Sequence, residues 1–183
     1  MSQPLQQTGI EGVYLLESFR QQDKRGAFVK PYRKSWFAEH QLETDFVEDY
    51  YSVSAKNVFR GLHFQRPPHA HTKLVYCTCG EALDILVDLR RGSATYGMPV
   101  TIPLSAAQAN AVYIPVGIAH GFIAKSDQVI MHYKTSTEYA PEHDAGINIE
   151  SVGLTIDTSK LILSDRDRAL PSLQQFDSPF SHG

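Results

Sequence analysis

The sequence is poor in cysteine: its 183 residues include only two, which stand close together as Cys77 and Cys79. Alternate positions of an extended strand point to the same side in parallel, a geometry that suits a disulfide poorly. One pair of thiolates is also too few for a structural zinc site. We therefore expect both cysteines to be reduced residues that pack in the interior.

Long apolar runs and an excess of one charge are missing as well. No uninterrupted apolar stretch is long enough for a transmembrane helix, and the first residues lack the charged segment and apolar core of a signal peptide. The formal net charge of -3 excludes a broadly basic nucleic-acid-binding surface, although a basic cluster inside a pocket stays open. We expect a cytoplasmic protein with no membrane or nucleic-acid partner.

The chain is organised as one unit. A hydrophobic fraction of 42% is close to the globular average and excludes wholesale disorder. Turn residues are scattered singly, and no linker or repeat divides the sequence, so we expect one domain over residues 1–183. Residues 34–41 have helical spacing, with Ser35 as a candidate N-cap. The segment from about 159 onward is less regular, and residues 164–170 predict one helical turn that closes against the rest.

The centre of the chain has the period of β-strands. Leu83, Ile85 and Val87 alternate with polar and apolar residues, so both faces of this strand are partly apolar, as in a sandwich with two covered sheets. Further short runs follow at the spacing typical of an all-β sandwich or barrel. These runs are residues 46–54, 57–65, 72–79, 98–103, 111–115, 121–124 and 128–136.

His63 lies in the run Arg60-Gly61-Leu62-His63, where strand alternation places it on the face of Gly61 and places Arg60 on the opposite face. One interpretation is a core histidine with a single hydrogen bond. The other is a site residue, because the glycine leaves open space for a ligand beside the imidazole. Both interpretations stay open from these residues alone.

Other polar residues carry the same ambiguity. Lys73 shares a face with apolar residues, and is either a strand-end lysine that reaches solvent or a positive charge held near a substrate oxygen. His120 follows Pro115 and Gly117, so we expect it in a tight connection. Tyr133 is either a buried core phenol or a proton donor.

A metal site is an alternative that the spacing supports only weakly. His69 and His71 form an H-x-H pair, and His120 could supply a third ligand. The carboxylate that such sites use a few residues later is missing, since the first acid after Lys73 is Glu81. The pair also follows two prolines and is expected in a loop, so we predict no metal.

The joint order of these motifs is specific. The segments RGLHFQ (60–65), HTKLV (71–75), PVGIAHGF (115–122), YKT with YAPEH (133–143) and SDRD (164–167) resemble the nucleotide-sugar 3,5-epimerase family from about Tyr14 to about Leu173. The resemblance implies an all-β, cupin-type β jelly roll sandwich with a few short helices. It also implies a homodimer, a nucleotide-diphosphate sugar as substrate, and no metal or organic cofactor.

The reaction implied is inversion of the carbons that flank the C4 ketone of a nucleotide-linked 4-keto-6-deoxyhexose, at C3, C5 or both. By resemblance His63 is the base, and Asp167 is the carboxylate that orients it. Lys73 stabilises the enolate oxygen, and Tyr133 returns a proton from the opposite face. Such a reaction belongs to deoxysugar biosynthesis.

The substrate-binding residues that the resemblance implies are more varied. Tyr139 matches an aromatic that stacks on the nucleotide base, and the remaining residues contact the diphosphate and the sugar: Arg25, Arg60, Lys73, His120 and Arg166. Lys30, Glu48 and Asp144 stand where the family commonly has other residues. We therefore hypothesise that the nucleotide, the sugar or the number of inverted centres differs, for example a CDP-linked sugar or a single inversion.

Two further functions remain as alternatives. A metal-dependent cupin isomerase or oxygenase would need a metal at the histidines named above. A non-catalytic sugar-nucleotide-binding protein of the same fold would have lost His63, Tyr133 or Asp167, whereas all three are present.

Overall fold

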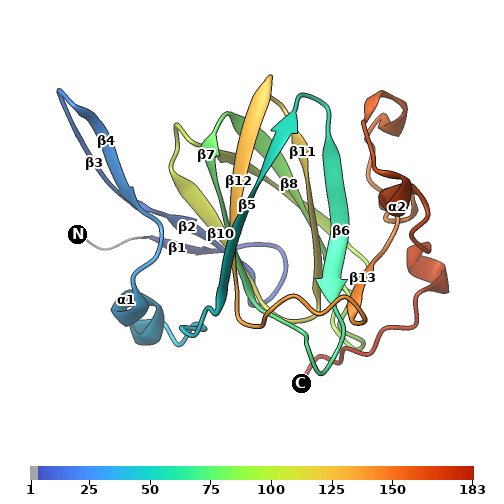
Figure 1. Ribbon diagram of the computed structural model, residues 1–183. Helices are drawn as coiled ribbons and strands as arrows, with labels where there is room; N and C mark the ends of the chain where they lie inside the picture. Colours follow the sequence, from blue (N-terminus) through green and yellow to red (C-terminus); the bar gives the residue numbers. More distant parts are fainter. Residues whose placement is uncertain (1–3) are drawn as a thin grey trace.

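The computed structural model describes residues 4–183 and consists of a β-sandwich with a projecting hairpin (Figure 1). One sheet has the strand order β1-β2-β10-β7-β12-β5. Its strands are β1 (Leu5–Gln7), β2 (Tyr14–Glu17), β5 (Glu48–Ala55), β7 (Lys73–Cys79), β10 (Asn110–Ile114) and β12 (Gln128–Thr135).

The facing sheet has the order β13-β6-β11-β8-β9. Its strands are β6 (Phe59–Gln65), β8 (Glu81–Asp88), β9 (Pro99–Ser105), β11 (Ile118–Ala124) and β13 (Asp144–Gly146). All the pairings within both sheets are antiparallel. The prediction of an all-β sandwich is therefore confirmed, and most predicted strands begin and end within a few residues of the observed ones.

Both faces of β8 are covered, as its alternation predicts. Leu86 packs between the two sheets with Val75 and Met131. Ile85 and Val87 point the other way and pack under the C-terminal segment. Burying these side chains on both faces removes apolar surface from water and is the main stabilisation of the sandwich.

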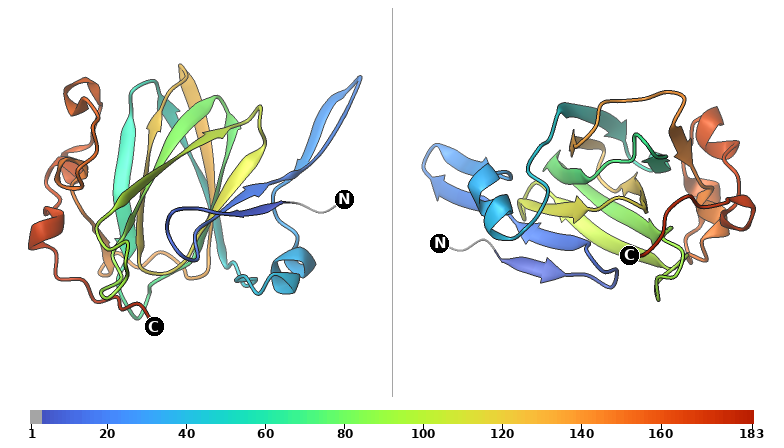
Figure 2. Two further views of the ribbon diagram at one scale, coloured as in Figure 1. Left: turned by 180° about the vertical axis from the view of Figure 1, so that it is seen from behind. Right: turned by 90° about the horizontal axis from the view of Figure 1, so that it is seen from below.

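The C-terminal segment lies along the outer face of the second sheet, where it appears in orange and red (Figure 2). Its helical turns are η1 (Ile149–Ser151), η2 (Thr158–Lys160), α2 (Asp165–Arg168) and η3 (Leu173–Gln175). The ring of Phe64 on β6 meets those of Phe176 and Phe180 at 5.0 and 5.8 Å between centroids. The predicted closing turn is thus present, and it brings α2 against β6.

Helix α1 (Lys34–Glu39) covers part of the first sheet with the buried rings of Trp36 and Phe37. The prediction of Ser35 as its N-cap is wrong. Arg33 occupies the cap position in an extended conformation and makes no side-chain cap hydrogen bond. Ser35 lies inside the first turn, so the helix depends on the burial of its aromatic residues.

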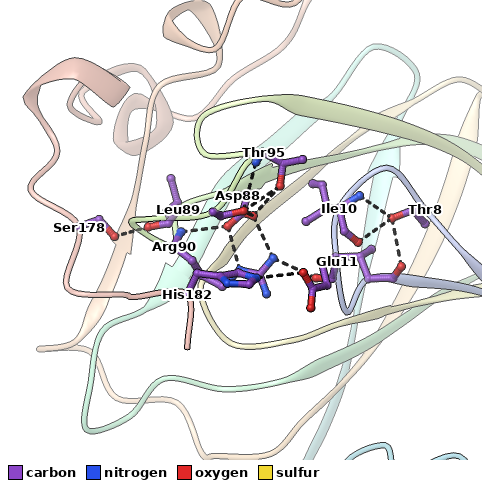
Figure 3. A network of polar contacts seen from close by, with 11 residues as sticks. Thr8, Ile10, Glu11, Asp88, Leu89, Arg90, Thr95, Ser178 and His182 are labelled. Atoms are coloured by element: carbon purple, nitrogen blue, oxygen red, sulfur yellow. Dashed lines mark hydrogen bonds and ion pairs between the residues drawn. The ribbon is translucent and has the colours of Figure 1, made fainter.

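A polar network joins the N-terminal loop to the end of β8 (Figure 3). The fully buried Asp88 accepts hydrogen bonds from Arg90 at 2.9 Å, from Ser93 at 2.6 Å and from Thr95 at 2.7 Å. Burial raises the pKa of Asp88, but these hydrogen bonds outweigh it and hold the pKa at about 2. Arg90 also donates to the carbonyl of Glu11 at 2.9 Å.

Strands β3 (Phe19–Asp23) and β4 (Gly26–Lys30) form a hairpin that extends away from the sandwich (Figure 1). Every residue of β4 is exposed, including Phe28 with 57% of its surface accessible.

Cys77 is buried and Cys79 is partly buried, and both are free thiols, as predicted. Within residues 4–183, no helix has the length and apolar character needed to cross a membrane.

Candidate active site

A cavity of about 700 Å³ opens between the two sheets and the C-terminal segment. Ten of the twelve residues predicted for the site line it: Glu48, Arg60, His63, Lys73, His120, Tyr133, Tyr139, Asp144, Arg166 and Asp167. These residues span more than a hundred positions of the sequence, and the sandwich brings them to one place.

His63 on β6 and Asp167 on α2 form a hydrogen-bonded pair. Nε2 of His63 lies 2.7 Å from Oδ1 of Asp167, whose side chain is 5% exposed. Burial raises the pKa of Asp167, but the His63 hydrogen bond and charge and the Ser164 hydroxyl outweigh it and lower the pKa. The carboxylate therefore accepts the Nε2 proton, which leaves Nδ1 of His63 unprotonated and able to act as a base.

The Ser164 side chain positions Asp167. Its hydroxyl accepts a hydrogen bond from the backbone N–H of Asp167 at 3.1 Å and caps the short helix α2. This cap, together with the packing of the C-terminal segment on the outer sheet, holds the carboxylate beside a strand that is about a hundred residues earlier in the sequence.

Arg60 lines the cavity together with His63, so its predicted place on the opposite face is wrong. The register between β6 and β11 explains the difference: His120 pairs with His63, but Phe122 pairs with Arg60. Between these pairs, one residue of β11 opposes two of β6, and this bulge reverses the alternation of side chains. Arg60 is held by hydrogen bonds to the Ser54 hydroxyl at 3.0 Å and the Val53 carbonyl at 3.2 Å.

Lys73 begins β7 and is 6% exposed, so it does not reach solvent. Its Nζ donates to the backbone carbonyl of His63 at 3.1 Å, which leaves further N–H bonds for a ligand. Burial lowers the pKa of Lys73 to about 8, and Asp144 and Asp84 partly oppose this effect. The amine is therefore mostly charged at neutral pH and lies beside the base.

Tyr133 projects into the cavity from β12 in the first sheet. Its hydroxyl lies 3.3 Å from Oγ of Ser52, and its ring stacks on Tyr50 with 4.8 Å between centroids. Burial raises the pKa of Tyr133 far above its ordinary value, with a smaller opposing effect from Ser52. The phenol is therefore protonated at neutral pH, the form that can donate a proton.

His120 lies inside β11 and is 4% exposed, so the prediction of a loop histidine is wrong. The turn ends at Gly117, whose φ of +88° favours glycine, and the strand begins at the next residue. Nε2 of His120 lies 2.8 Å from Oδ1 of Asp84, which is fully buried. Burial raises the pKa of Asp84, and the charge and hydrogen bond of His120 oppose this rise.

A chain of polar contacts forms the rim of the cavity. Arg166 pairs with Asp144 at 2.7 Å, and the Tyr139 hydroxyl donates to the same carboxylate at 3.2 Å. Tyr139 is 59% exposed, so its ring is open to a planar ligand. Glu48 lines the same cavity from β5.

Arg25 and Lys30 are the two predicted residues that this cavity does not include. Both belong to the projecting hairpin. Arg25 pairs with Asp23 at 2.6 Å beside the turn of the hairpin, and the Nζ of Lys30 lies 5.8 Å from the centre of the Phe28 ring. Their contact with a ligand stays a prediction, and within one copy of the chain neither residue lines this cavity.

The histidines of the metal alternative do not come together. His69 stacks on His143 with 4.6 Å between centroids and does not line the cavity, whereas His71 and His120 do. Within the part of the chain that the structure describes, no group of three or more His, Cys, Asp or Glu side chains is placed to hold a metal ion. The H-x-H pair does lie in a loop, as predicted.

Several residues that line or support the cavity are given no part in epimerisation by the sequence alone. Tyr50 and Ser52 follow Glu48 at alternate positions of β5, so strand alternation from Glu48 could have found them. Asp84 is a carboxylate between apolar residues in the middle of β8, which signals a buried partner. Gln65 and His71 line the wall near Lys73.

Comparison with known proteins gives consistent matches. The family model described as dTDP-4-dehydrorhamnose 3,5-epimerase matches residues 7–175. The dTDP-4-dehydrorhamnose 3,5-epimerase of Escherichia coli (strain K12) is 44% identical over 173 residues, which cover 92% of this chain and 93% of that protein. The dTDP-4-dehydrorhamnose 3-epimerase of Streptomyces niveus is 37% identical over 167 residues, which cover 90% of this chain and 81% of that protein.

A solved structure matches the whole chain. It is the dTDP-6-deoxy-D-glucose-3,5-epimerase of Legionella pneumophila Philadelphia 1, in complex with dTDP-4-keto-L-rhamnose. Its TM-score is 0.92 at 33% identity, and the match covers 100% of both chains.

Proposed function

Because this chain belongs to the dTDP-4-dehydrorhamnose 3,5-epimerase family, we propose that the cavity inverts a nucleotide-linked 4-keto-6-deoxyhexose through His63 and Tyr133. The chain is an epimerase, and its reaction class is proton removal next to the C4 ketone followed by return of a proton from the opposite face. One observation carries the assignment of residues: the His63–Asp167 pair and the Tyr133 phenol face one cavity from opposite sheets.

The first step is removal of a proton from C3 or C5. A C–H bond beside a ketone is weakly acidic, because the electron pair left behind moves onto the ketone oxygen. Nδ1 of His63 takes this proton, and the Asp167 carboxylate stabilises the imidazolium through Nε2. Lys73 lies beside His63 and stabilises the negative charge on the enolate oxygen.

The second step is return of a proton to the other face of the sugar. Tyr133 is in the protonated form and comes from the opposing sheet, so its hydroxyl approaches the ring from the side away from His63. The tyrosinate that forms is close to the Ser52 hydroxyl, which donates a hydrogen bond to it. No cofactor is needed for either proton transfer.

The rim residues bind the nucleotide-diphosphate part of the substrate. Tyr139 stacks on the base through its exposed ring. Arg60 and Arg166 supply guanidinium groups suited to the diphosphate oxygens. Glu48 and Asp144 lie on the same rim and contact the base or the sugar, which makes them the residues that decide nucleotide preference.

A homodimer accounts for Arg25 and Lys30. The resemblance assigns both to substrate binding, yet the hairpin carries them away from the cavity of its own chain. We infer that the hairpin reaches the cavity of a second copy. The exposed side chains Phe28 and Tyr51, at 57% and 63% accessible, lie on the hairpin and on the edge strand β5 and would be covered in this assembly.

A mixing experiment tests the dimer. The Arg25→Ala and His63→Asn proteins are each expected to have little activity. If the hairpin acts across the dimer, mixed dimers contain one cavity with both residues intact, and partial activity returns on subunit exchange. No recovery in demonstrably mixed dimers would mean that Arg25 does not complete the cavity of the other chain.

The substrate is tested by incubating the protein with dTDP-, CDP- and GDP-linked 4-keto-6-deoxy sugars in deuterium oxide. Mass and proton spectra then report which carbons exchange and which invert. A single inversion, as the name of the Streptomyces niveus relative specifies for C3, would make this chain a mono-epimerase. Absence of exchange with every sugar would overturn the proposed reaction.

A further inference from the structure

His71 lies on the cavity wall immediately before β7 and has no role in the mechanism above. It lies in the loop two residues before Lys73. Both line the cavity beside the ketone end of the proposed site.

The hydrogen bonds around Gln65 favour one tautomer of His71. The backbone N–H of Ala140 donates to Oε1 of Gln65 at 2.6 Å, so the amide nitrogen faces Nδ1 of His71 at 3.2 Å. The same nitrogen also lies 2.9 Å from the His69 carbonyl and 3.2 Å from the Glu138 carbonyl, and it can only donate. Its contact with Nδ1 therefore favours the tautomer with the ring proton on Nε2.

The ring stays neutral in this position. Burial lowers the pKa of His71 to about 3, and the nearby charges of Lys73 and His120 add to this effect. Between about pH 3 and about pH 8, His71 is thus a neutral N–H donor while the Lys73 amine is charged.

Nε2 of His71 is buried and has no hydrogen-bond partner among the residues that the structure describes. A buried donor without an acceptor costs free energy, and such groups in folded proteins often mark the place of a ligand atom. A neutral donor beside Lys73 can share an anionic oxygen with the ammonium group without adding a second positive charge.

We propose that Nε2–H of His71 donates a hydrogen bond to the ketone oxygen of the sugar and, with Lys73, stabilises the enolate. This inference rests on the proposed epimerase reaction. Removal of a proton from C3 and from C5 places negative charge on the same oxygen, so His71 assists both steps equally. A donor to a sugar hydroxyl would instead affect one carbon more than the other.

The experiment compares His71→Phe, which keeps a ring and removes the donor, with His71→Gln, which keeps an N–H. His69→Phe is the matched control, because its side chain lies on the same loop outside the cavity. Proton exchange at C3 and C5 is measured in deuterium oxide, and affinity for dTDP is measured by calorimetry. We expect His71→Phe to lose about 10- to 100-fold in exchange at both carbons, with unchanged dTDP affinity and partial rescue in His71→Gln.

Several results would overturn the proposal. These are full exchange in His71→Phe, a loss confined to one carbon, or loss of dTDP binding in both variants, which would indicate a structural role. Nitrogen-15 spectra of the unaltered protein give a test that needs no variant, since a proton on Nδ1 of His71 would contradict the geometry. If the unaltered protein exchanges no sugar, the proposed function itself fails; a defect seen only in the variants concerns His71 alone.

Discussion

The imidazole of His63 and the phenol of Tyr133 stand on opposite sheets of the sandwich and line one cavity. Epimerisation needs a base and an acid on opposite faces of a ring, and a sandwich supplies this arrangement when one residue comes from each layer. Lys73 completes the set, because it begins a strand of the Tyr133 sheet and donates to the carbonyl of His63.

Replacing His63 with asparagine removes the base and keeps a polar side chain of similar size. Proton exchange of the keto sugar is expected to fall by about 10²–10⁴-fold or more, because proton transfer by a positioned group contributes this much. Affinity for dTDP should stay near that of the unaltered protein. His40→Asn, at a histidine whose ring bonds to the Trp36 carbonyl, is the control, and exchange that persists in His63→Asn would assign the base elsewhere.

The Asp167→Asn substitution tests the dyad. An amide in this place favours the wrong tautomer of His63, so we expect a loss of about 10³-fold or more in exchange rate with little change in stability. Asp165→Asn is the matched control, since Asp165 is exposed on the same helical turn and does not line the cavity. Equal effects of the two substitutions would indicate damage to α2 instead of loss of the dyad.

Tyr133→Phe separates inversion from exchange. His63 can still remove a proton and return deuterium to the same face, whereas return from the opposite face needs the phenol. Inversion should therefore fall more than exchange at the first carbon, measured in one sample by proton spectra. Tyr76→Phe on the outer side of the same sheet is the control, and parallel loss of both reactions in Tyr133→Phe would give the phenol a structural role.

The buried charge of Lys73 lowers the free energy of unfolding at neutral pH. Its pKa is about 8 in the folded protein and near 10.5 when exposed, so between these values the unfolded chain binds a proton that the folded chain does not. Below pH 8 the folded protein carries this buried charge, and its full cost is subtracted from the free energy of unfolding. As the pH rises towards 10.5 the amine loses its proton, and the cost disappears. Lys73→Met should be inactive yet more stable, by about 1–3 kcal/mol at pH 7, with a smaller gain at pH 10. Denaturation of both proteins at matched pH values measures this difference, and a gain that does not shrink would contradict the burial argument.

Breaking the Asp88 network should lower the free energy of unfolding and leave the proton-exchange activity of the folded protein unchanged. Arg90→Ala removes the only cation paired with the fully buried Asp88 among the described residues, leaves the hydroxyl groups and the backbone N–H of residue 90 as its partners, and should cost about 3 kcal/mol in unfolding free energy. Arg91→Ala breaks an exposed pair with Asp177 and should cost less than about 1 kcal/mol. Urea denaturation compares the two, and exchange activity of folded Arg90→Ala should be unchanged because the network lies outside the cavity.

Much of the fold follows from alternation in the sequence. The pattern of β8 predicts a strand covered on both faces, and the structure has the sheet core on one face and the C-terminal segment on the other. Three local details could not be derived in this way. Ser35 has the chemistry of a cap but lies inside α1, His120 follows a turn but belongs to β11, and Arg60 shares a side with His63.

The cavity was predictable only in part, because partners distant in sequence decide what each residue does. The joint motif order points to ten residues that the fold brings together, but Asp84 becomes meaningful only beside His120. The assignment of the His71 proton to Nε2, which has no partner among the described residues, depends on the orientation of the Gln65 amide beside Nδ1. Arg25 and Lys30 lie on the hairpin outside this cavity, and their proposed role requires a second copy of the chain, which no pattern within one chain describes.

The bulge beside His63 limits substitution at two glycines that do not line the cavity. A Cβ atom at Gly61 would lie 2.5 Å from the Cα of Gly121, and one at Gly121 would lie 2.7 Å from the carbonyl oxygen of Arg60. Any larger residue at either position would push β6 and β11 apart and move the imidazole relative to its carboxylate. Variants for new sugars should therefore be sought among the rim residues. That region can be altered without disturbing the backbone contact between β6 and β11 that positions His63.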